Sequence, residues 1–247
     1  MSQRLKLVIA YDGTLFAGWQ SQSHRNTIQD QLERAFKRIN GDSVRVHGAG
    51  RTDAGVHALA QCAHVQVPDR KLTPPRWAAA LNALLPPAIR VLQCQRVSED
   101  FHARFSAKGK VYRYRIWSAA VLPPLEYGRA WHVITPIDSG VIKSVASRFV
   151  GTHDFAGFTA NRGKRESDTV RTIRSAIVRR RGPCLTIDFD GDGFLYKMVR
   201  LMVGSLVRCA TAQLTVHDMA EKLDRGRSLQ ARFVAPAQGL FLVRVRY

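Results

Sequence analysis

The sequence has few cysteines and no long apolar run. Its four cysteines, Cys62, Cys94, Cys184 and Cys209, lie far apart without a CxxC pair, so a zinc site is unsupported and buried free thiols are favoured over disulfides. No segment reaches the roughly 18 uninterrupted apolar residues that a membrane span needs. The apolar run before Asp12 is too short for a secretion signal, so we expect a protein of the cytoplasm.

Acidic residues are also scarce. The chain has 19 Asp and Glu against 38 Lys and Arg, which gives a net charge of +19 at pH 7. This excess favours a nucleic acid or an anionic membrane surface as the partner. A length of 247 residues allows one large domain or two halves that share a cleft, and 45% hydrophobic residues is ordinary for a globular enzyme.

Common cofactor and metal motifs are incomplete or missing. There is no Walker A lysine, and the GAG of residues 48–50 is followed by Asp53 where a dinucleotide-binding loop needs glycine. Three aspartates at positions 188, 190 and 192 resemble the start of a calcium loop, but its twelfth position is Val199 instead of a glutamate. We therefore predict that these aspartates form a strand-end turn and that one of them pairs with the basic surface.

Apolar patterning predicts an α+β protein with mixed or antiparallel sheets instead of a regular βαβ series. We predict strands at residues 5–10, 43–47, 60–67, 89–97, 110–117, 170–179, 184–189 and 240–247. Predicted helices are a 28–39 stripe capped by Thr27 and Asp30 and ended by Gly41, Pro74–Leu84, a 141–149 stripe, 194–210, and a short last helix opened by Thr215 and Asp218. A boundary in residues 118–129, which contain two prolines and a glycine, predicts halves 1–117 and 118–247.

The segment GAGRTDAGVHA, residues 48–58, places Asp53 in a glycine-rich loop between two predicted strands. Arg51 lies two residues earlier, and a nearby positive charge favours an ionised and oriented carboxylate. Such a carboxylate can serve as a nucleophile or a general base. From the residues alone, an aspartate that bonds its own backbone in a turn is the competing interpretation.

Four blocks in order along the chain carry a family resemblance. They are YDGTLFAGWQ (11–20), GRTDAGVHA (50–58), FHARFSAKGKVYRYRI (101–116) and FLYKMVRLMVGSL (194–206), and the match continues to GLFLVRVRY at the carboxyl end. In these blocks the chain resembles the tRNA pseudouridine synthases that modify positions 38 to 40 of the anticodon arm. The resemblance covers nearly the whole chain.

The resemblance implies roles for four residues. Asp53 takes the position of the catalytic aspartate, and Tyr112 that of a tyrosine that contacts the target base and is proposed to help move its proton. Arg200 takes the position of an arginine thought to pair with the aspartate, and Arg51 that of an RNA contact or loop-ordering residue. The resemblance also implies two α/β halves whose sheets join across a basic cleft, a homodimer, and no metal or organic cofactor.

This activity suits the residues. Converting uridine to pseudouridine breaks the N1–C1′ bond, turns the uracil and joins C5 to C1′, which needs a carboxylate but no energy input. Asp53 could attack covalently or remove a sugar proton, and the sequence leaves both routes open. The base must also leave its stack, which favours an aromatic contact such as Tyr112, although Tyr114 lies on the same strand face.

Other interpretations stay open at this point. Arg200 lies on an apolar helix, where it could pair with Asp53 or extend its charge to solvent. A non-catalytic RNA-binding protein with the same basic cleft is the alternative function. We expect further basic residues to hold phosphates, and we expect structural roles for two histidines and a packed tryptophan. The basic residues include Arg162, Lys164, Arg165 and Arg171, and the structural residues are His57, His102 and Trp19.

Overall fold

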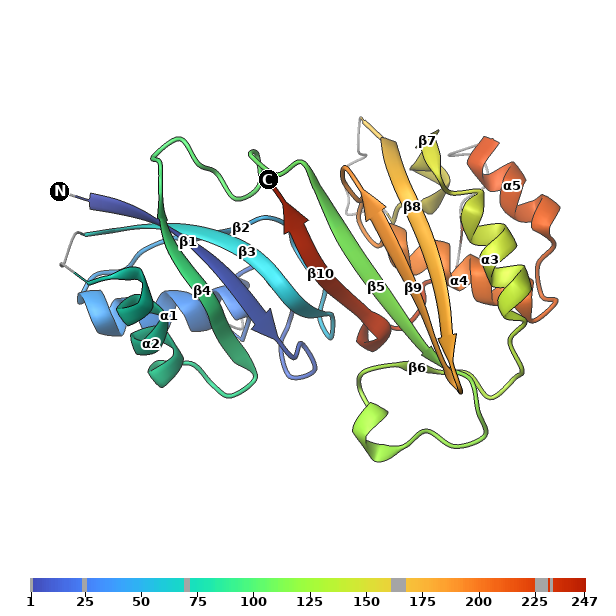
Figure 1. Cartoon of the computed structure of the whole chain (residues 1–247), viewed down its shortest axis with the longest axis horizontal. Coiled ribbons are helices and arrows are strands. Elements are labelled where there is room, and N and C mark those ends of the chain that lie inside the picture. The colour runs from blue at the N-terminus through green and yellow to red at the C-terminus, as the bar shows by residue number, and fades with distance from the viewer. Residues whose placement is uncertain (1, 24–25, 69–71, 161–167, 225–230, 232) are drawn as a thin grey trace. The chain divides into compact units, whose positions relative to one another are not determined.

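The computed structural model describes residues 2–23, 26–68, 72–160, 168–224, 231 and 233–247 (Figure 1). The chain divides into two compact units. Unit 1 contains residues 1–108 and 241–247, and unit 2 contains residues 109–240. In the described part of the chain, no helix is long and apolar enough to cross a membrane.

The sheet of unit 1 has the strand order β4-β1-β3-β10. Its strands are β1 (Ser2–Tyr11), β3 (His57–Pro68), β4 (Ile89–Val97) and β10 (Leu240–Arg246). β1 runs antiparallel to β3 and β4, whereas β10 is parallel to β3 and places Phe241 opposite His57. The short β2 (Val46–Gly48) also pairs with β3. Alternate residues of β1 are buried, as expected for a strand with one face on the core.

Two helices accompany this sheet. α1 (Ile28–Asn40) begins after Thr27, whose hydroxyl accepts from the Asp30 backbone N–H at 3.2 Å and donates to the Asp30 carboxylate at 2.6 Å. It ends at Gly41 with φ of 83°, so both predicted ends are confirmed. α2 (Pro74–Leu84) has the predicted bounds, and the rings of Phe36 and Trp77 lie 5.7 Å apart between the two helices.

The sheet of unit 2 has the order β5-β9-β8-β7, and all three of these pairings are antiparallel. The strands are β5 (Gly109–Trp117), β7 (Gly151–Asp154), β8 (Val170–Arg181) and β9 (Cys184–Gly191), and β6 (Trp131–His132) runs parallel to β5. Residues 182–183 connect β8 to β9, and Gly182 has φ of 56°, the left-handed region that glycine favours.

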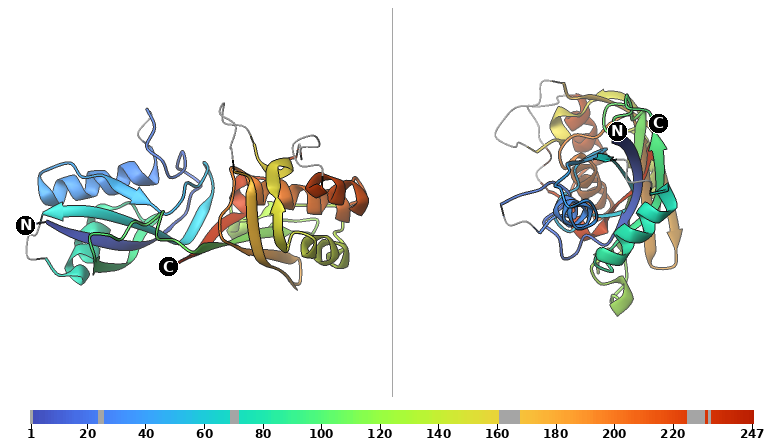
Figure 2. Two further views of the ribbon diagram at one scale, coloured as in Figure 1. Left: turned by 90° about the horizontal axis from the view of Figure 1, so that it is seen from above. Right: turned by 90° about the vertical axis from the view of Figure 1, so that its left-hand side faces the viewer.

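Three helices gather on one side of the unit 2 sheet (Figures 1 and 2). They are α3 (Ser139–Ser147), α4 (Met198–Ala210) and α5 (Val216–Asp224), with short 3₁₀ turns at Pro124–Glu126, Phe155–Phe158 and Ala237–Gly239. The aromatic core is formed by Phe149, Phe155, Phe158 and Phe189, which are fully buried. This apolar layer holds the helices on the sheet.

The α+β class is confirmed, and several details differ from expectation, among them β6 and β7, which were not predicted. β2 lies at Val46–Gly48 instead of 43–47. α4 begins at Met198 instead of 194, because Lys197 has φ of 58° and so interrupts helical geometry. The units divide after residue 108 instead of 117, since all of β5 pairs with β9, and the final strand returns to unit 1 by pairing with β3.

Candidate active site

Asp53 lies in the connection between β2 and β3 of unit 1, and its side chain is half-buried. The connection is tightly turned, because the Val56 backbone N–H donates to the Asp53 carbonyl at 3.1 Å and Gly55 has φ of 77°. Asp53 therefore lies on a loop whose backbone is tightly turned.

The segment 11–20 holds this loop at Thr52, the residue just before Asp53. The Tyr11 hydroxyl and the Thr52 hydroxyl are 2.8 Å apart, and the Trp19 backbone N–H donates to the Thr52 carbonyl at 3.0 Å. Burial raises the pKa of Tyr11 to about 12, so its hydroxyl stays protonated at neutral pH. Trp19 is buried, as expected for a packed tryptophan. Two motifs that are far apart in sequence thus form one structure.

Gly18 is required where these two motifs touch. Its φ is 90°, and a Cβ atom added there would lie 2.5 Å from the Thr52 carbonyl oxygen and 3.0 Å from the Asp53 carbonyl carbon. Contacts this short do not occur between real Cβ atoms and backbone. A side chain at position 18 would therefore displace the backbone that carries Asp53.

His57 anchors the other end of the loop. Its Nδ1 accepts from the Gly13 backbone N–H at 3.1 Å, and its ring stacks on Phe241 with centroids 4.6 Å apart. The side chain is almost fully buried. These contacts fit the structural role expected for this histidine.

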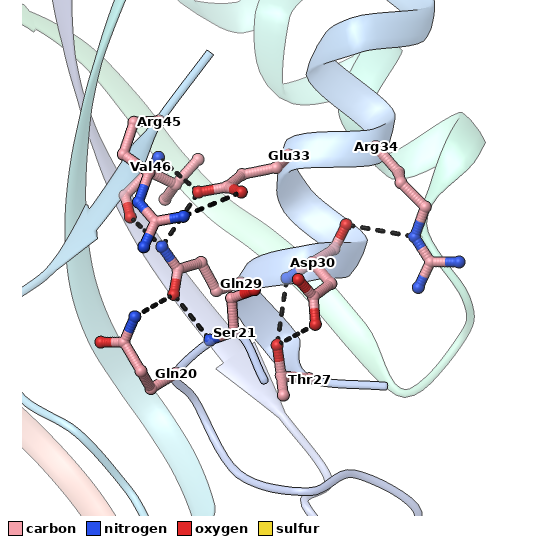
Figure 3. A network of polar contacts seen from close by, with 9 residues as sticks. All are labelled: Gln20, Ser21, Thr27, Gln29, Asp30, Glu33, Arg34, Arg45 and Val46. Carbon is pink, nitrogen blue, oxygen red and sulfur yellow. Dashed lines mark hydrogen bonds and ion pairs between the residues drawn. The ribbon is translucent and has the colours of Figure 1, made fainter. Parts of the chain in front are cut away.

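Arg51 is exposed, and its guanidinium is oriented by Gln20. Arg51 Nε donates to Gln20 Oε1 at 3.1 Å, while the preceding carbonyl, that of Gly50, accepts from Gln61 Nε2 at 2.9 Å. Gln20 is itself held by Gln29 of α1 (Figure 3). The arginine beside Asp53 therefore has a defined direction.

In unit 2, Tyr112 and Tyr114 have different surroundings, although the sequence alone did not distinguish them. Tyr114 is fully buried, its hydroxyl donates to the Pro236 carbonyl at 2.7 Å, and burial raises the pKa of that hydroxyl. Tyr112 is 8% exposed and meets the Phe194 ring edge-on at 5.0 Å. Tyr114 thus has a structural role in its own unit, and Tyr112 stays the residue to which the family resemblance gives the contact with the base.

Arg200 lies in the first turn of α4, on a helix whose other side chains are mostly buried. Its Nε donates to the Ala235 carbonyl at 2.7 Å, and its own carbonyl accepts from the Ala235 backbone N–H at 3.1 Å. Arg200 is half-buried, and these two hydrogen bonds tie it to the segment that leads into β10. Neither of the two expected arrangements for Arg200 included this backbone partner.

The predicted site residues fall into two groups. Asp53 and Arg51 belong to unit 1, and Tyr112 and Arg200 belong to unit 2. Each group is ordered by contacts within its own unit. The pairing of Arg200 with Asp53 that the resemblance implies stays a prediction.

Two of the three aspartates at positions 188, 190 and 192 are bound by arginines, and Asp192 accepts from the Thr172 backbone N–H at 3.1 Å. Asp188 accepts from Arg113 Nε and Nη2 at 2.7 and 2.8 Å and from Arg179 Nη1 at 3.1 Å, and Asp190 accepts from Arg174 at 3.1 Å. The prediction that one of these acids pairs with basic residues is confirmed. The predicted strand-end turn is wrong for Asp188 and Asp190, which lie within β9, and only Asp192 follows that strand. Among the described residues, no group of three or more His, Cys, Asp or Glu side chains could hold a metal ion.

Some of the remaining predicted residues can be placed. Arg171 is ion-paired with Asp168 at 3.3 Å, and the Nδ1 atom of His102 accepts from two backbone N–H groups of its own turn. The predicted phosphate contacts Arg162, Lys164 and Arg165 lie outside the described residues. The four cysteines are free thiols, as predicted.

Sequence comparison decides the family. The model of a family described as tRNA pseudouridine synthase matches residues 7–106 and 145–247. This chain belongs to that family. As a tRNA pseudouridine synthase, it is an isomerase that acts on tRNA.

Curated relatives agree along the whole chain. A protein from Akkermansia muciniphila named tRNA pseudouridine synthase A is 43% identical over 99% of this chain and 95% of the relative. A protein of the same name from Solidesulfovibrio magneticus is 44% identical over 99% of this chain and 91% of the relative. Another from Geobacillus kaustophilus is 41% identical over 100% of this chain and 95% of the relative. Among solved structures, a Cbf5-Nop10-Gar1 complex matches with 13% identity and a TM-score of 0.38, over 96% of this chain and 48% of that one.

Residues that support the candidate site were not predicted from the sequence. Tyr11, Gly18 and Gln20 lie in a block that was singled out for its resemblance, but their contacts with the Asp53 loop were not foreseen. Two glycines within six residues of this block, Gly13 and Gly18, were the available signal, because clustered glycines indicate close backbone approach.

Proposed function

We propose that this tRNA pseudouridine synthase converts uridine to pseudouridine at positions 38, 39 and/or 40 of the anticodon stem-loop, with Asp53 as the catalytic carboxylate. We further propose that it acts as a homodimer in the cytoplasm. The observation that carries the proposal is the loop of residues 49–56, in which a single aspartate is held by hydrogen bonds on both sides.

Rigid support matters because the reaction moves a base between two bonds of one sugar. N1–C1′ breaks, the uracil turns, and C5–C1′ forms, after which the C5 proton is lost and N1 gains one. A carboxylate that attacks the sugar or base, or that removes a sugar proton, must stay within reach of the reacting atom while the base turns. The contacts at Thr52 and His57 supply that constraint on Asp53.

Two residues of unit 2 complete the proposed site. Tyr112, which takes the position of the base-contacting tyrosine in the family, contacts the flipped uracil and assists its proton transfer. Arg200 pairs with Asp53 and favours its ionised form. Arg51 contacts the RNA beside the target nucleotide, where a phosphate is its natural partner.

The net charge of +19 supports the substrate assignment. Each lysine or arginine that contacts a phosphate on a duplex region should steepen the log–log salt dependence of binding by about 0.9. Three neighbouring uridines differ in their surroundings, so an enzyme that accepts all of them reads the shape and backbone of the stem-loop more than base edges.

The test is Asp53→Asn with tRNA that carries tritium at uridine C5. We expect tritium release by the parent in the presence of a chelator, a loss of at least about 1,000-fold in the variant, and similar RNA binding by both. Asp42→Asn, an exposed aspartate of unit 1 after α1, is the control and should keep parental activity. Full activity in Asp53→Asn would contradict the mechanism, and an inactive parent would favour a non-catalytic RNA-binding protein.

Position preference is measured separately with three tRNAs that each keep one uridine at 38, 39 or 40. Tritium release from at least one of them supports the assignment to the anticodon arm. Release only from uridines elsewhere in the tRNA would contradict the assignment and leave the role of Asp53 intact.

A further inference from the structure

Gln29 lies at the centre of a polar network between α1, β2 and the segment that precedes α1 (Figure 3). Its side chain is 2% exposed, and every hydrogen-bonding position of its amide is used. Oε1 accepts from Gln20 Nε2 at 2.9 Å and from the Ser21 backbone N–H at 2.8 Å. Nε2 donates to Glu33 Oε1 at 2.9 Å and to the Val46 carbonyl at 3.0 Å.

The orientation of the Gln29 amide is determined by two backbone groups, one of which can only donate a hydrogen bond and the other only accept one. The Ser21 N–H can only donate, so the atom facing it is Oε1 of Gln29. The Val46 carbonyl can only accept, so the atom facing it is Nε2. A flipped Gln29 amide would place two donors together on one side and two acceptors together on the other.

The orientation of the Gln29 amide in turn sets the orientation of the Gln20 amide, which contacts Arg51. Because Oε1 of Gln29 needs a donor, Gln20 must turn its NH₂ group toward Gln29 and its carbonyl oxygen away. That oxygen accepts from Arg51 Nε, which can only donate. The buried glutamine thus determines which end of Gln20 meets the arginine two residues before Asp53.

The network also joins the elements on either side of the loop. The backbone N–H groups of Ile28 and Gln29, at the start of α1, donate to the carbonyls of Gly18 and Trp19 at 3.1 Å. On the other side, Glu33 Oε1 accepts from the Val46 N–H at 3.0 Å, at the first residue of β2. Through these hydrogen bonds, Gln20 and its contact with Arg51 are held by α1 and β2 and not by a loop alone.

We propose that Gln29 is a positioning residue which, through Gln20, holds the Arg51 guanidinium in the direction that engages the RNA beside the target uridine. The inference rests on the proposed function, because it assigns a role to residues that touch neither the base nor Asp53. Nε of Arg51 donates its hydrogen bond to Gln20. The Nη1 and Nη2 groups are therefore the part of the guanidinium that this arrangement presents to a phosphate. Without the Gln20 contact, Arg51 would lose rotamer entropy on every encounter with RNA.

The test is a pair of double-mutant cycles with kcat and KM measured by tritium release. Gln29→Met keeps the length of the side chain and removes its four hydrogen bonds, and Gln20→Leu removes only the link to Arg51 and Gln29. We expect each to lower kcat/KM by about 5- to 20-fold and Arg51→Ala by about 30-fold. In the Arg51→Ala background, neither glutamine substitution should lower kcat/KM by more than about twofold further.

Two matched controls separate positioning from general destabilisation. Thr27→Ala removes the cap of the same helix, and Gln22→Leu removes an exposed glutamine whose Nε2 donates to the Ala17 carbonyl in the same segment. Both should retain kcat/KM within about twofold of the parent at a temperature where all variants are folded. Gln20→Leu keeps the proposal testable if Gln29→Met fails to fold, because Gln20 is less buried.

Each outcome has a defined meaning. Non-additivity of either glutamine substitution with Arg51→Ala supports the proposal. Losses that multiply in the double variants, or equal losses in the two controls, would overturn it while leaving the proposed function in place. A parent that releases no tritium from tRNA would overturn the proposed function and, with it, this inference.

Discussion

Gly18→Ala tests whether the close approach of residues 11–20 holds the Asp53 loop in place. At φ of 90° an alanine is strained, which costs about 1–2 kcal/mol of folding free energy. The new Cβ would also lie 2.5 Å from the Thr52 carbonyl oxygen, next to the Trp19–Thr52 hydrogen bond. Overpacking of this kind costs about 1–3 kcal/mol more, so we expect a loss of roughly 2–5 kcal/mol in all.

Gly182→Ala is the matched control. Gly182 also has a positive φ, of 56°, but a Cβ atom there would meet nothing within 4 Å. The control therefore carries only the backbone strain, about 1–2 kcal/mol. The difference in the free energy of unfolding between the two variants, measured by urea denaturation at pH 7, isolates the contact with the Asp53 loop.

The same pair of variants also gives a catalytic result. Relief of the overlap would move the loop backbone by several tenths of an ångström, so we expect kcat for tritium release to fall by about 10- to 100-fold in Gly18→Ala. In Gly182→Ala, kcat should stay within about twofold of the parent. Equal stability of the two variants, together with unchanged kcat in Gly18→Ala, would refute the reasoning.

Two further predictions concern buried titratable groups. Burial, with His102 nearby, lowers the pKa of His64 from 6.5 to about 4, so the folded state binds fewer protons than the unfolded state between these values and stability falls as the pH drops. Urea denaturation should show that the free energy of unfolding of the parent falls by up to about 2 kcal/mol between pH 7 and pH 5, and that it falls by less in His64→Asn. An equal fall in the two proteins would contradict this prediction. Tyr114→Phe should lower stability by about 1–2 kcal/mol, because the Pro236 carbonyl loses its donor, whereas Tyr112→Phe should chiefly lower kcat; the reverse pattern would exchange the two roles.

Elements with local start and stop signals were well predicted from the sequence. Thr27, Asp30 and Gly41 define both ends of α1 through hydrogen bonds and a positive φ that are encoded within a few residues. The prolines at 74 and 75 similarly mark the start of α2. Such signals need no information from the rest of the fold.

Features that depend on tertiary pairing were predicted less well. β10 belongs to unit 1 because Phe241 and Leu242 pair with His57 and Ala58, which are more than 180 residues away in sequence. The start of α4 depends on the left-handed backbone of Lys197, a conformation that propensity does not reveal for lysine. No local pattern identifies either feature.

The candidate site shows the same division. The motif around residue 53 draws attention to Asp53 and Arg51 because it is local, and the family resemblance gives these two residues their expected roles, which stay predictions. Gln29 gives no such signal, because a glutamine in the first turn of a helix is ordinary until its amide is seen to join three backbone segments. Support for a functional residue comes from other parts of the chain, and only the folded structure identifies it.

The described contacts that support the Asp53 loop are mostly between neutral groups. They are the Tyr11–Thr52 hydroxyl pair, the Gly13 N–H on the His57 ring, and the amides of Gln20 and Gln29. In the sheet of unit 2, by contrast, Arg113 and Arg179 share the Asp188 carboxylate. Exposed ion pairs weaken with salt and compete with phosphates for the same arginines, whereas neutral buried hydrogen bonds do neither. A basic enzyme can therefore change its affinity for RNA with ionic strength while the geometry of the loop that carries Asp53, the proposed catalytic residue, stays constant.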